Sequence, residues 1–309
     1  MTPGRPVVVE TVAELRARCD AARGAGQRVG LVPTMGFLHA GHRSLMAAAR
    51  ADCELVVVTI FVNPLQFGAN EDLDRYPRDL SGDLAACGAE GVDLVFAPPV
   101  AELYPTYPPA TTVHVEGLTD ALCGASRPGH FDGVTTIVAK LFSIVGPARA
   151  YFGRKDAQQL AVVSRMAADL ELPTEVIGCP LVREPDGLAM SSRNAYLDAE
   201  HRAVAPAIFA ALRRAAAAVV DGERSAGAVA AMITDDLAAV PLLRVDYVEV
   251  RDAATIAAID RLDGAVLVAV AVFCGATRLI DNIRLVVTGD EVAADLGIRA
   301  GAPSADPVG

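Results

Sequence analysis

The first part of the chain alternates between short apolar runs and stretches with helical spacing. Runs at residues 28–33, 54–62 and 92–96 predict strands, and the second is apolar on both faces, as in a central strand of a parallel sheet. Helices are predicted around them at residues 11–23, 43–50, 79–90 and 134–145. This alternation predicts an α/β fold with a doubly wound, Rossmann-like parallel sheet.

The pattern changes after residue 180. Two helical stretches, 199–220 and 225–239, precede strand-like runs at residues 244–251, 265–273 and 278–287. We therefore expect a first domain over residues 1–180 and a smaller α+β lid domain over residues 181–287. Beyond Thr288 no apolar period continues, which predicts a flexible tail over residues 288–309. A short β segment is also expected at residues 111–115.

Composition narrows the class of protein. The chain has 309 residues, is 52% hydrophobic and carries a formal net charge of -11 at pH 7. A nucleic-acid surface needs clustered Lys and Arg, so this charge argues against nucleic acid and favours small-molecule substrates. The N-terminal apolar stretch is too short for a signal peptide, and residues 265–273 fall far below the ~20 residues of a membrane helix. Six scattered cysteines predict reduced core residues, so we expect a cytoplasmic protein without membrane association.

Candidate chemistry begins between the first strand and the helix that follows it. Residues 35–42 read Met-Gly-Phe-Leu-His-Ala-Gly-His, a turn that would aim backbone N–H groups and a helix N-terminus at an anion. Gly36 and Gly41 permit close approach of a ligand, and His39 and His42 can face one phosphate. An isolated His-x-x-His is more often a metal pair or a surface pair, but no Cys, Asp or Glu follows closely to complete a zinc shell.

Residues 33–42 resemble the His-x-Gly-His signature of nucleotidyltransferases related to class I aminoacyl-tRNA synthetases, and specifically the pantothenate synthetase family. That family condenses (R)-pantoate with β-alanine, using ATP and forming pantoyl adenylate, AMP and pyrophosphate. The resemblance implies that His42, His39 and Lys155 are catalytic. It further implies an ATP site made of Met35, Gly36, Phe37, Leu38, His39, Ala40, Gly41, His42, Gly153, Arg154, Lys155, Asp156, Val182, Met190, Ser191, Ser192 and Arg193.

Two further segments carry the resemblance. Residues 61–67 match Phe-Val-Asn-Pro-x-Gln-Phe, and residues 153–159 match Gly-x-Lys-Asp-x-Gln-Gln, with Arg154 and Ala157 in place of the usual Glu and Tyr. The implied contacts to pantoate and β-alanine come from Gln66, Gln159, Asn63 and His130. Magnesium is implied with ATP, with Asp83 as its ligand, although Gly82 replaces a frequent Asp of the family. The resemblance also implies a homodimer formed through the first domain.

Three other functions stay open from the residues themselves. A cytidylyltransferase would keep the histidine pair but lack the two glutamine positions. A dinucleotide oxidoreductase should show Gly-x-Gly-x-x-Gly after the first strand, which residues 35–39 do not match. A non-catalytic regulator would bind ATP without turning it over. The sequence names no base for the amine of β-alanine.

Overall fold

The structure is a computed structural model that describes residues 4–69 and 71–300. The chain divides into two units, Met1–Cys179 and Pro180–Gly309. The first unit ends within one residue of the boundary expected at residue 180. Each unit has its own sheet, and the two are described separately.

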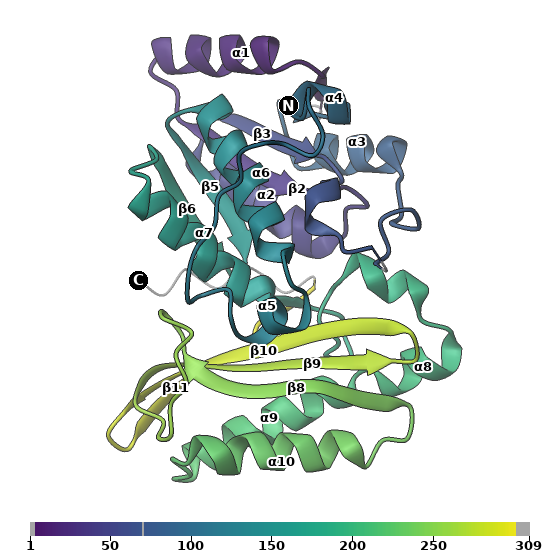
Figure 1. The fold of residues 1–309 in the computed structure, drawn as a ribbon, viewed down its shortest axis with the longest axis vertical. Coiled ribbons are helices and arrows are strands. Elements are labelled where there is room, and N and C mark those ends of the chain that lie inside the picture. The colour runs from purple at the N-terminus through teal and green to yellow at the C-terminus, as the bar shows by residue number, and fades with distance from the viewer. Residues whose placement is uncertain (1–3, 70, 301–309) are drawn as a thin grey trace. The chain divides into compact units, whose positions relative to one another are not determined.

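The first unit is built on a six-stranded sheet in the order β1-β4-β3-β2-β5-β6, with parallel pairing between the neighbours (Figure 1). The strands are β1 (Val7–Val9), β2 (Val29–Thr34), β3 (Leu55–Ile60), β4 (Leu94–Phe96), β5 (Ala148–Gly153) and β6 (Thr174–Cys179). The winding direction reverses between β2 and β5, and right-handed crossovers then place helices on both faces. This confirms the predicted doubly wound fold and puts a ligand crevice at the carboxyl ends of β2 and β5.

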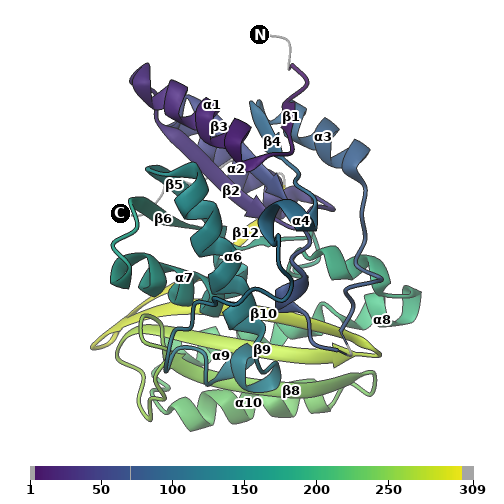
Figure 2. The same cartoon turned by 45° about the horizontal axis from the view of Figure 1, so that its top comes forward.

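Figure 2 shows the helices of this unit. They are α1 (Val12–Gly24), α2 (Ala40–Asp52), η1 (Pro64–Gln66), α3 (Leu80–Ala89), α4 (Val100–Leu103), α5 (Leu122–Ser126), α6 (His130–Val145), η2 (Arg154–Asp156) and α7 (Ala157–Asp169). Of these, α1, α2, α3 and α6 fall on the four stretches where helices were predicted. Residues 111–115 form no strand, contrary to expectation. Thr135 and Thr136 of α6 bond to the backbone of Val113 through their hydroxyls, so side chains replace a neighbouring strand.

The second unit has an antiparallel sheet in the order β11-β10-β9-β8 and a parallel pair of β12 with β7. Its elements are β7 (Val182–Arg183), η3 (Ser192–Tyr196), α8 (Ala199–Val204), α9 (Ala207–Val220), α10 (Ala226–Ala238), β8 (Leu243–Asp252), β9 (Gly264–Cys274), β10 (Thr277–Thr288), β11 (Glu291–Asp295) and β12 (Ile298–Arg299). Helices α9 and α10 lie along one face of the sheet, where their buried residues join those of β9 and β10 in one core.

One stretch in the described part of the chain, residues 199–220, is long and apolar enough to cross a membrane. In the structure it is not a single helix, because Ala205 and Pro206 separate α8 from α9. Buried residues of α9, including Leu212 and Val219, pack in the core of the second unit. The apolar residues on this face of α9 are therefore covered by the core of the second unit.

The predicted flexible tail is wrong over residues 288–300. Thr288 ends β10, β11 pairs antiparallel with β10, and β12 pairs with β7. β11 forms a hairpin with β10 at the edge of the sheet and has little burial, and β12 is only two residues long. Neither strand therefore gives a strong apolar period in the sequence. Backbone pairing therefore orders this segment where the side-chain pattern carries no signal. The remaining predicted tail, residues 301–309, lies outside the described residues.

Candidate active site

The loop between β2 and α2, residues 35–42, is called the histidine loop here. Two successive residues lie in the left-handed region, Gly36 at φ +85° and Phe37 at φ +51°. A non-glycine residue is rare there, so the turn needs support from its surroundings. His39 then caps α2 by accepting from the N–H of Gly41, and the His42 side chain accepts in turn from the His39 N–H.

These caps fix the tautomers of both imidazoles. Nδ1 of His39 accepts from Gly41 N–H at 3.1 Å, and Nδ1 of His42 accepts from His39 N–H at 3.3 Å. In each neutral ring the proton must therefore be on Nε2, which becomes the donor. The ring centroids are 4.1 Å apart, so the two donors are neighbours.

Both histidines are neutral at pH 7. Burial, with the charge of Lys155 adding to it, lowers the pKa of His39 to about 4. Burial, then His39 and Lys155, lowers the pKa of His42 well below its usual value. The histidine loop therefore offers neutral N–H donors to a phosphate rather than positive charge.

Positive charge comes from Lys155 in η2, at the carboxyl end of β5. Its Nζ is 3.5 Å from the Asp156 carboxylate, and its charge contributes to the lowered pKa of both histidines. Arg154, in contrast, lies against β6: its Nε would be 3.5 Å from a Cβ atom added at Gly178. The two segments predicted to bind phosphate, residues 35–42 and 153–156, thus follow β2 and β5. These are the neighbouring strands between which the winding direction reverses.

The two amide side chains that follow β3, those of Asn63 and Gln66, differ in burial and in their contacts. Asn63 is 1% exposed, and its Nδ2 donates to the carbonyl of Gly133 and to Oε1 of Gln66, at 3.0 and 3.1 Å. Its Oδ1 accepts from the hydroxyl of Tyr104 at 2.9 Å. Gln66 is only half-buried and its Nε2 lies 3.2 Å from Sδ of Met35 in the histidine loop. Asn63 therefore supports Gln66, which borders the histidine loop.

His130 is also engaged on both ring nitrogens. Nδ1–H donates to the carbonyl of Gln66 at 2.9 Å, and Nε2 accepts from Nη1 of Arg127 at 2.9 Å. Arg127 in turn makes a two-pronged ion pair with Glu71, with Nε to Oε1 at 2.7 Å. Burial and the Arg127 charge lower the pKa of His130 to about 4. Arg127 and Glu71 were not predicted; the Arg-Pro-x-His spacing was the available signal.

The two adjacent glutamines of α7, Gln158 and Gln159, differ in how far they are buried. Gln158 is 5% exposed and ties down residues 118–123, donating to the carbonyls of Leu118 and Ala121 and accepting from Cys123 N–H. Gln159 is half-buried one helix position further on. Of this pair, Gln159 is therefore the residue whose side chain a ligand can reach, and its contact with pantoate stays a prediction.

Asp83 was predicted as a magnesium ligand, and its surroundings do not fit that role. It is 3% exposed, and its two carboxylate oxygens accept from the N–H groups of Phe37 and Leu38 at 2.9 and 2.7 Å. No group of three or more His, Cys, Asp or Glu that could hold a metal occurs in the described residues. Burial raises the pKa of Asp83, an effect opposed by these two hydrogen bonds.

Comparison with known proteins decides the family. The model of the pantoate-beta-alanine ligase family matches residues 7–284. The chain belongs to this family. It is 53% identical over 281 residues to the pantothenate synthetase of Moorella thermoacetica, covering 91% of this chain and 99% of that protein. The corresponding protein of Acetivibrio thermocellus is also 53% identical, over 277 residues, covering 89% and 98%.

Solved structures agree. The pantothenate synthetase of Thermus thermophilus superposes with a TM-score of 0.84 at 48% identity, covering 89% of this chain and 98% of that one. The pantoate-beta-alanine ligase of Francisella tularensis, complexed with beta-gamma ATP and β-alanine, gives 0.73 at 30% identity, covering 90% and 97%. The resemblance seen in residues 33–42 is thereby confirmed.

The second unit of this ligase-family chain contributes the serine loop, residues 184–193. Met190 N–H donates to the carbonyl of Val182, and Ser191 caps η3 by accepting from Arg193 N–H at 3.2 Å. Val182 is buried and paired with Ile298, and its contact with ATP stays a prediction. The predicted residues 190–193 thus form a compact turn with their own cap.

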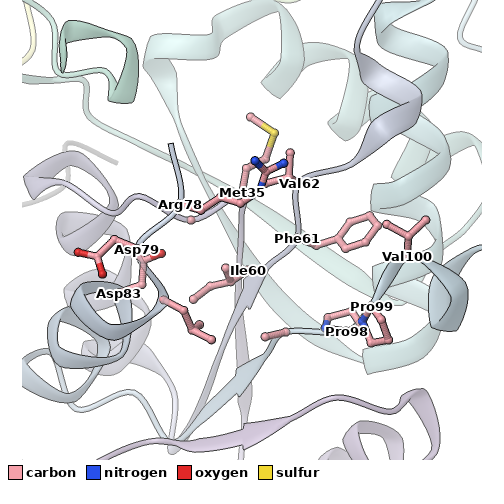
Figure 3. Close-up of a pocket in the computed structure, with 13 residues that line it drawn as sticks. Met35, Ile60, Phe61, Val62, Arg78, Asp79, Asp83, Pro98, Pro99 and Val100 are labelled. Carbon is pink, nitrogen blue, oxygen red and sulfur yellow. The ribbon is translucent and has the colours of Figure 1, made fainter. Parts of the chain in front are cut away.

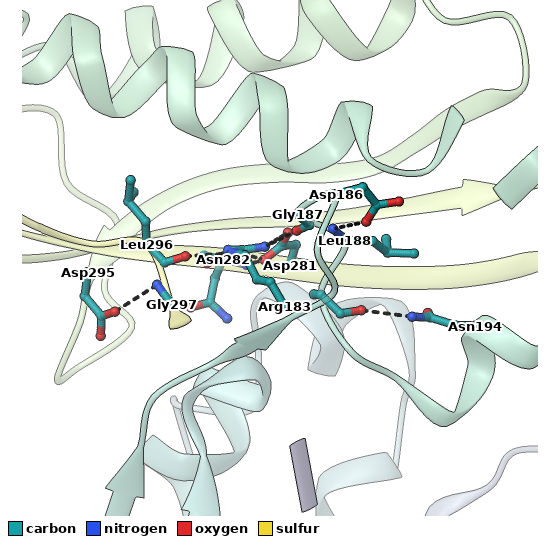
Figure 4. Close-up of polar contacts among 11 residues, drawn as sticks. Arg183, Asp186, Gly187, Leu188, Asn194, Asp281, Asn282, Asp295, Leu296 and Gly297 are labelled. Carbon is teal, nitrogen blue, oxygen red and sulfur yellow. Dashed lines mark hydrogen bonds and ion pairs between the residues drawn. The ribbon is translucent and has the colours of Figure 1, made fainter. Parts of the chain in front are cut away.

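A buried arginine holds the base of the serine loop (Figure 4). Arg183 is 1% exposed and forms a two-pronged ion pair with Asp281 of β10, at 2.6 and 3.0 Å. It also donates to the carbonyls of Gly187, Asn282 and Leu296. All five N–H groups of the guanidinium therefore have acceptors, and no pattern in the sequence signals this partnership.

Beside the histidine loop lies a mostly apolar pocket of about 310 Å³ at the carboxyl ends of β2, β3 and β4 (Figure 3). Ile60, Phe61 and Pro99 are among the residues that line it. Asp83 and Gly36 form part of its wall, so the contact between Asp83 and the histidine loop borders this pocket.

Proposed function

We propose that the chain condenses (R)-pantoate with β-alanine at the expense of ATP, giving pantothenate, AMP and pyrophosphate. Family membership supports the overall reaction. The observation that carries this proposal is that, in the first unit, a cluster suited to phosphate lies next to amide side chains suited to pantoate. A phosphate-type cluster of His39, His42 and Lys155 adjoins neutral amides through the Gln66–Met35 contact.

In the first step a carboxylate oxygen of pantoate bonds to the α-phosphorus of ATP, and the bond to the pyrophosphate oxygen breaks. The carboxylate has a pKa of about 4 and is already ionised at pH 7, so no base is needed. Lys155 supplies positive charge, while Nε2–H of His39 and of His42 donate neutral hydrogen bonds to phosphoryl oxygens. Each such donor contributes roughly 3 kcal/mol in comparable sites.

In the second step the amine of β-alanine attacks the acyl carbon and AMP leaves. An imidazole with a pKa of about 4, such as His39 or His130, is too weak a base for an amine of pKa about 10. We therefore propose that β-alanine reacts as its minor free-amine form. In this scheme Gln66 and Gln159 bind pantoate, and Asn63 and His130 hold Gln66 in place.

We propose that magnesium enters as the complex with ATP and that Asp83 is not its ligand, because both oxygens of the Asp83 carboxylate accept from the histidine loop. Residues 190–193 of the serine loop are proposed to bind ATP. A cytoplasmic location is supported by six buried free cysteines, which suit a reducing compartment. The proposed homodimer rests on the family resemblance and is tested by sedimentation equilibrium.

The deciding experiment is isotope exchange. With magnesium, ATP and pantoate but no β-alanine, the protein should exchange labelled pyrophosphate into ATP, because the first step is complete and reversible by itself. Omitting pantoate should abolish the exchange, and adding β-alanine should drain the intermediate to pantothenate. An ATP-binding regulator would bind ATP without exchange. Folded protein that shows no pantoate-dependent exchange would refute the two-step reaction.

A further inference from the structure

We infer that Asp83 is a positioning residue, an internal anion that holds the histidine loop in its active shape, and not a ligand of magnesium. The inference begins with the loop backbone. Gly36 and Phe37 both have positive φ, and in this turn the N–H groups of Phe37 and Leu38 point toward one carboxylate. Such a concavity binds anions, and here the carboxylate of Asp83 fills it.

The contact is specific in geometry. Oδ2 accepts from Phe37 N–H at 2.9 Å and Oδ1 from Leu38 N–H at 2.7 Å, so each oxygen serves one donor. A methyl group on Gly36 would lie 2.8 Å from Oδ2 and 3.0 Å from Ile60, too close for either. The position of the Asp83 carboxylate therefore leaves no room for a side chain at position 36.

The same contacts remove Phe37 and Leu38 N–H from the set of phosphate donors implied by the sequence. The hydrogen-bond donors of this turn therefore serve two different anions, the Asp83 carboxylate and the substrate phosphate. The N–H groups of residues 37 and 38 face Asp83, while the imidazoles of His39 and His42, carried by the next residues, are left for the substrate. The loop is thus preformed before ATP arrives, as a site that works by positioning requires.

Position 82 reinforces this conclusion. Gly82 N–H donates to Oδ1 of Asp79, which caps α3, and a side chain at Gly82 would begin 2.3 Å from Oδ2 of Asp79. A second aspartate beside Asp83 would need Asp79 to move. This chain therefore uses the first turn of α3 for a helix cap and a loop anchor.

The catalytic part of the inference rests on the proposed function, but the structural part is testable without it. Asp83→Asn replaces one acceptor by an NH₂ group that faces a loop N–H. Hydrogen exchange of the peptide containing residues 36–38, measured on ligand-free protein, should become at least roughly tenfold faster. Asp79→Asn is the matched control, since it removes the same charge from the same helix and keeps a good cap; its loop exchange should match that of wild type.

The magnesium dependence separates positioning from metal binding. In Asp83→Asn the maximal rate of pantoate-dependent pyrophosphate exchange should fall roughly 100-fold, as for a displaced catalytic group, with the magnesium concentration at half-maximal rate unchanged. If Asp83→Asn fails to fold, Asp83→Ala replaces it, because it leaves the same two loop N–H groups without acceptors, introduces no opposing donor and should speed loop exchange likewise. Unchanged loop exchange would overturn the inference, as would a several-fold rise in the magnesium requirement.

Discussion

The histidine loop of the first unit and the serine loop of the second are held by opposite means. Asp83, an anion, accepts from two backbone N–H groups of the histidine loop. Arg183, a cation, donates to one carbonyl of the serine loop, that of Gly187, and to the carbonyls of Asn282 and Leu296 in other segments. Asp83 meets neutral donors, but Arg183 also has Asp281 as a buried counter-ion. N–H groups that converge on one point are satisfied by an anion, and carbonyls that converge from several segments are satisfied by a cation.

The two sets of contacts should therefore affect different properties of the protein, catalysis in the first unit and stability in the second. The Asp83 contacts shape a turn that presents imidazoles, so their loss should be expressed mainly in the rate of the first step. The Arg183 contacts join β7, β10 and the segment before β12, so their loss should be expressed mainly in the stability of the second unit. Variants in each unit test this division.

The largest effect is expected on breaking the buried ion pair. Asp281→Ala leaves the Arg183 guanidinium buried without its counter-ion and should lower the free energy of unfolding by about 3–5 kcal/mol. Asp246→Ala is the control: it breaks an ion pair with Arg278 on the same sheet, but one with partly exposed partners, worth about 1 kcal/mol or less. Urea unfolding measures both; equal losses would remove the distinction drawn for Arg183.

The next effect concerns the histidine loop itself. His42→Ala removes one neutral donor and should slow pyrophosphate exchange by about 10²–10³, equivalent to roughly 3–4 kcal/mol, with the fold intact. His114→Ala is matched in residue type but lies at an exposed site paired with Asp132, and should retain the wild-type rate. A folded His42→Ala protein with normal exchange would contradict the role of the loop.

Acid should weaken the first unit through its neutral histidines. The pKa of His130 is lowered from 6.5 to about 4, so the unfolded state binds more protons in this window and stability falls as the pH drops from 6.5 to 4. One such group accounts for up to about 3 kcal/mol. In His130→Gln that pH dependence should shrink, as measured by urea unfolding at pH 7 and pH 4.5. An unchanged slope would mean that His130 is not held neutral.

The smallest effect should separate two neighbours in α7. Gln159→Leu should raise the KM for pantoate about tenfold, the loss of one hydrogen bond, with little change in ATP affinity. Gln158→Leu should instead lower stability, because it leaves the carbonyls of Leu118 and Ala121 without their donor. A pantoate titration of each variant and its melting curve check the assignment; a reversed pattern would exchange the two roles.

Sequence alone determined the periodic parts of the molecule. Apolar runs placed β2 and β3, helical spacing placed α1 and α10, and the strand–turn–helix order at residues 29–52 located the histidine loop. These signals are local, because a buried face imposes its period on neighbouring residues whatever surrounds them. The family resemblance added function at the same positions.

Only the tertiary structure decided which polar groups meet. Asp83 reaches a loop 46 residues upstream, and Arg183 reaches Asp281, 98 residues downstream, and nothing periodic links such partners. The neutral state of His39 and His42 likewise follows from burial and backbone donors that sequence does not reveal. Residues 291–295 and 298–299 became strands because their backbone N–H and C=O groups, which every sequence has, found partners on β10 and β7.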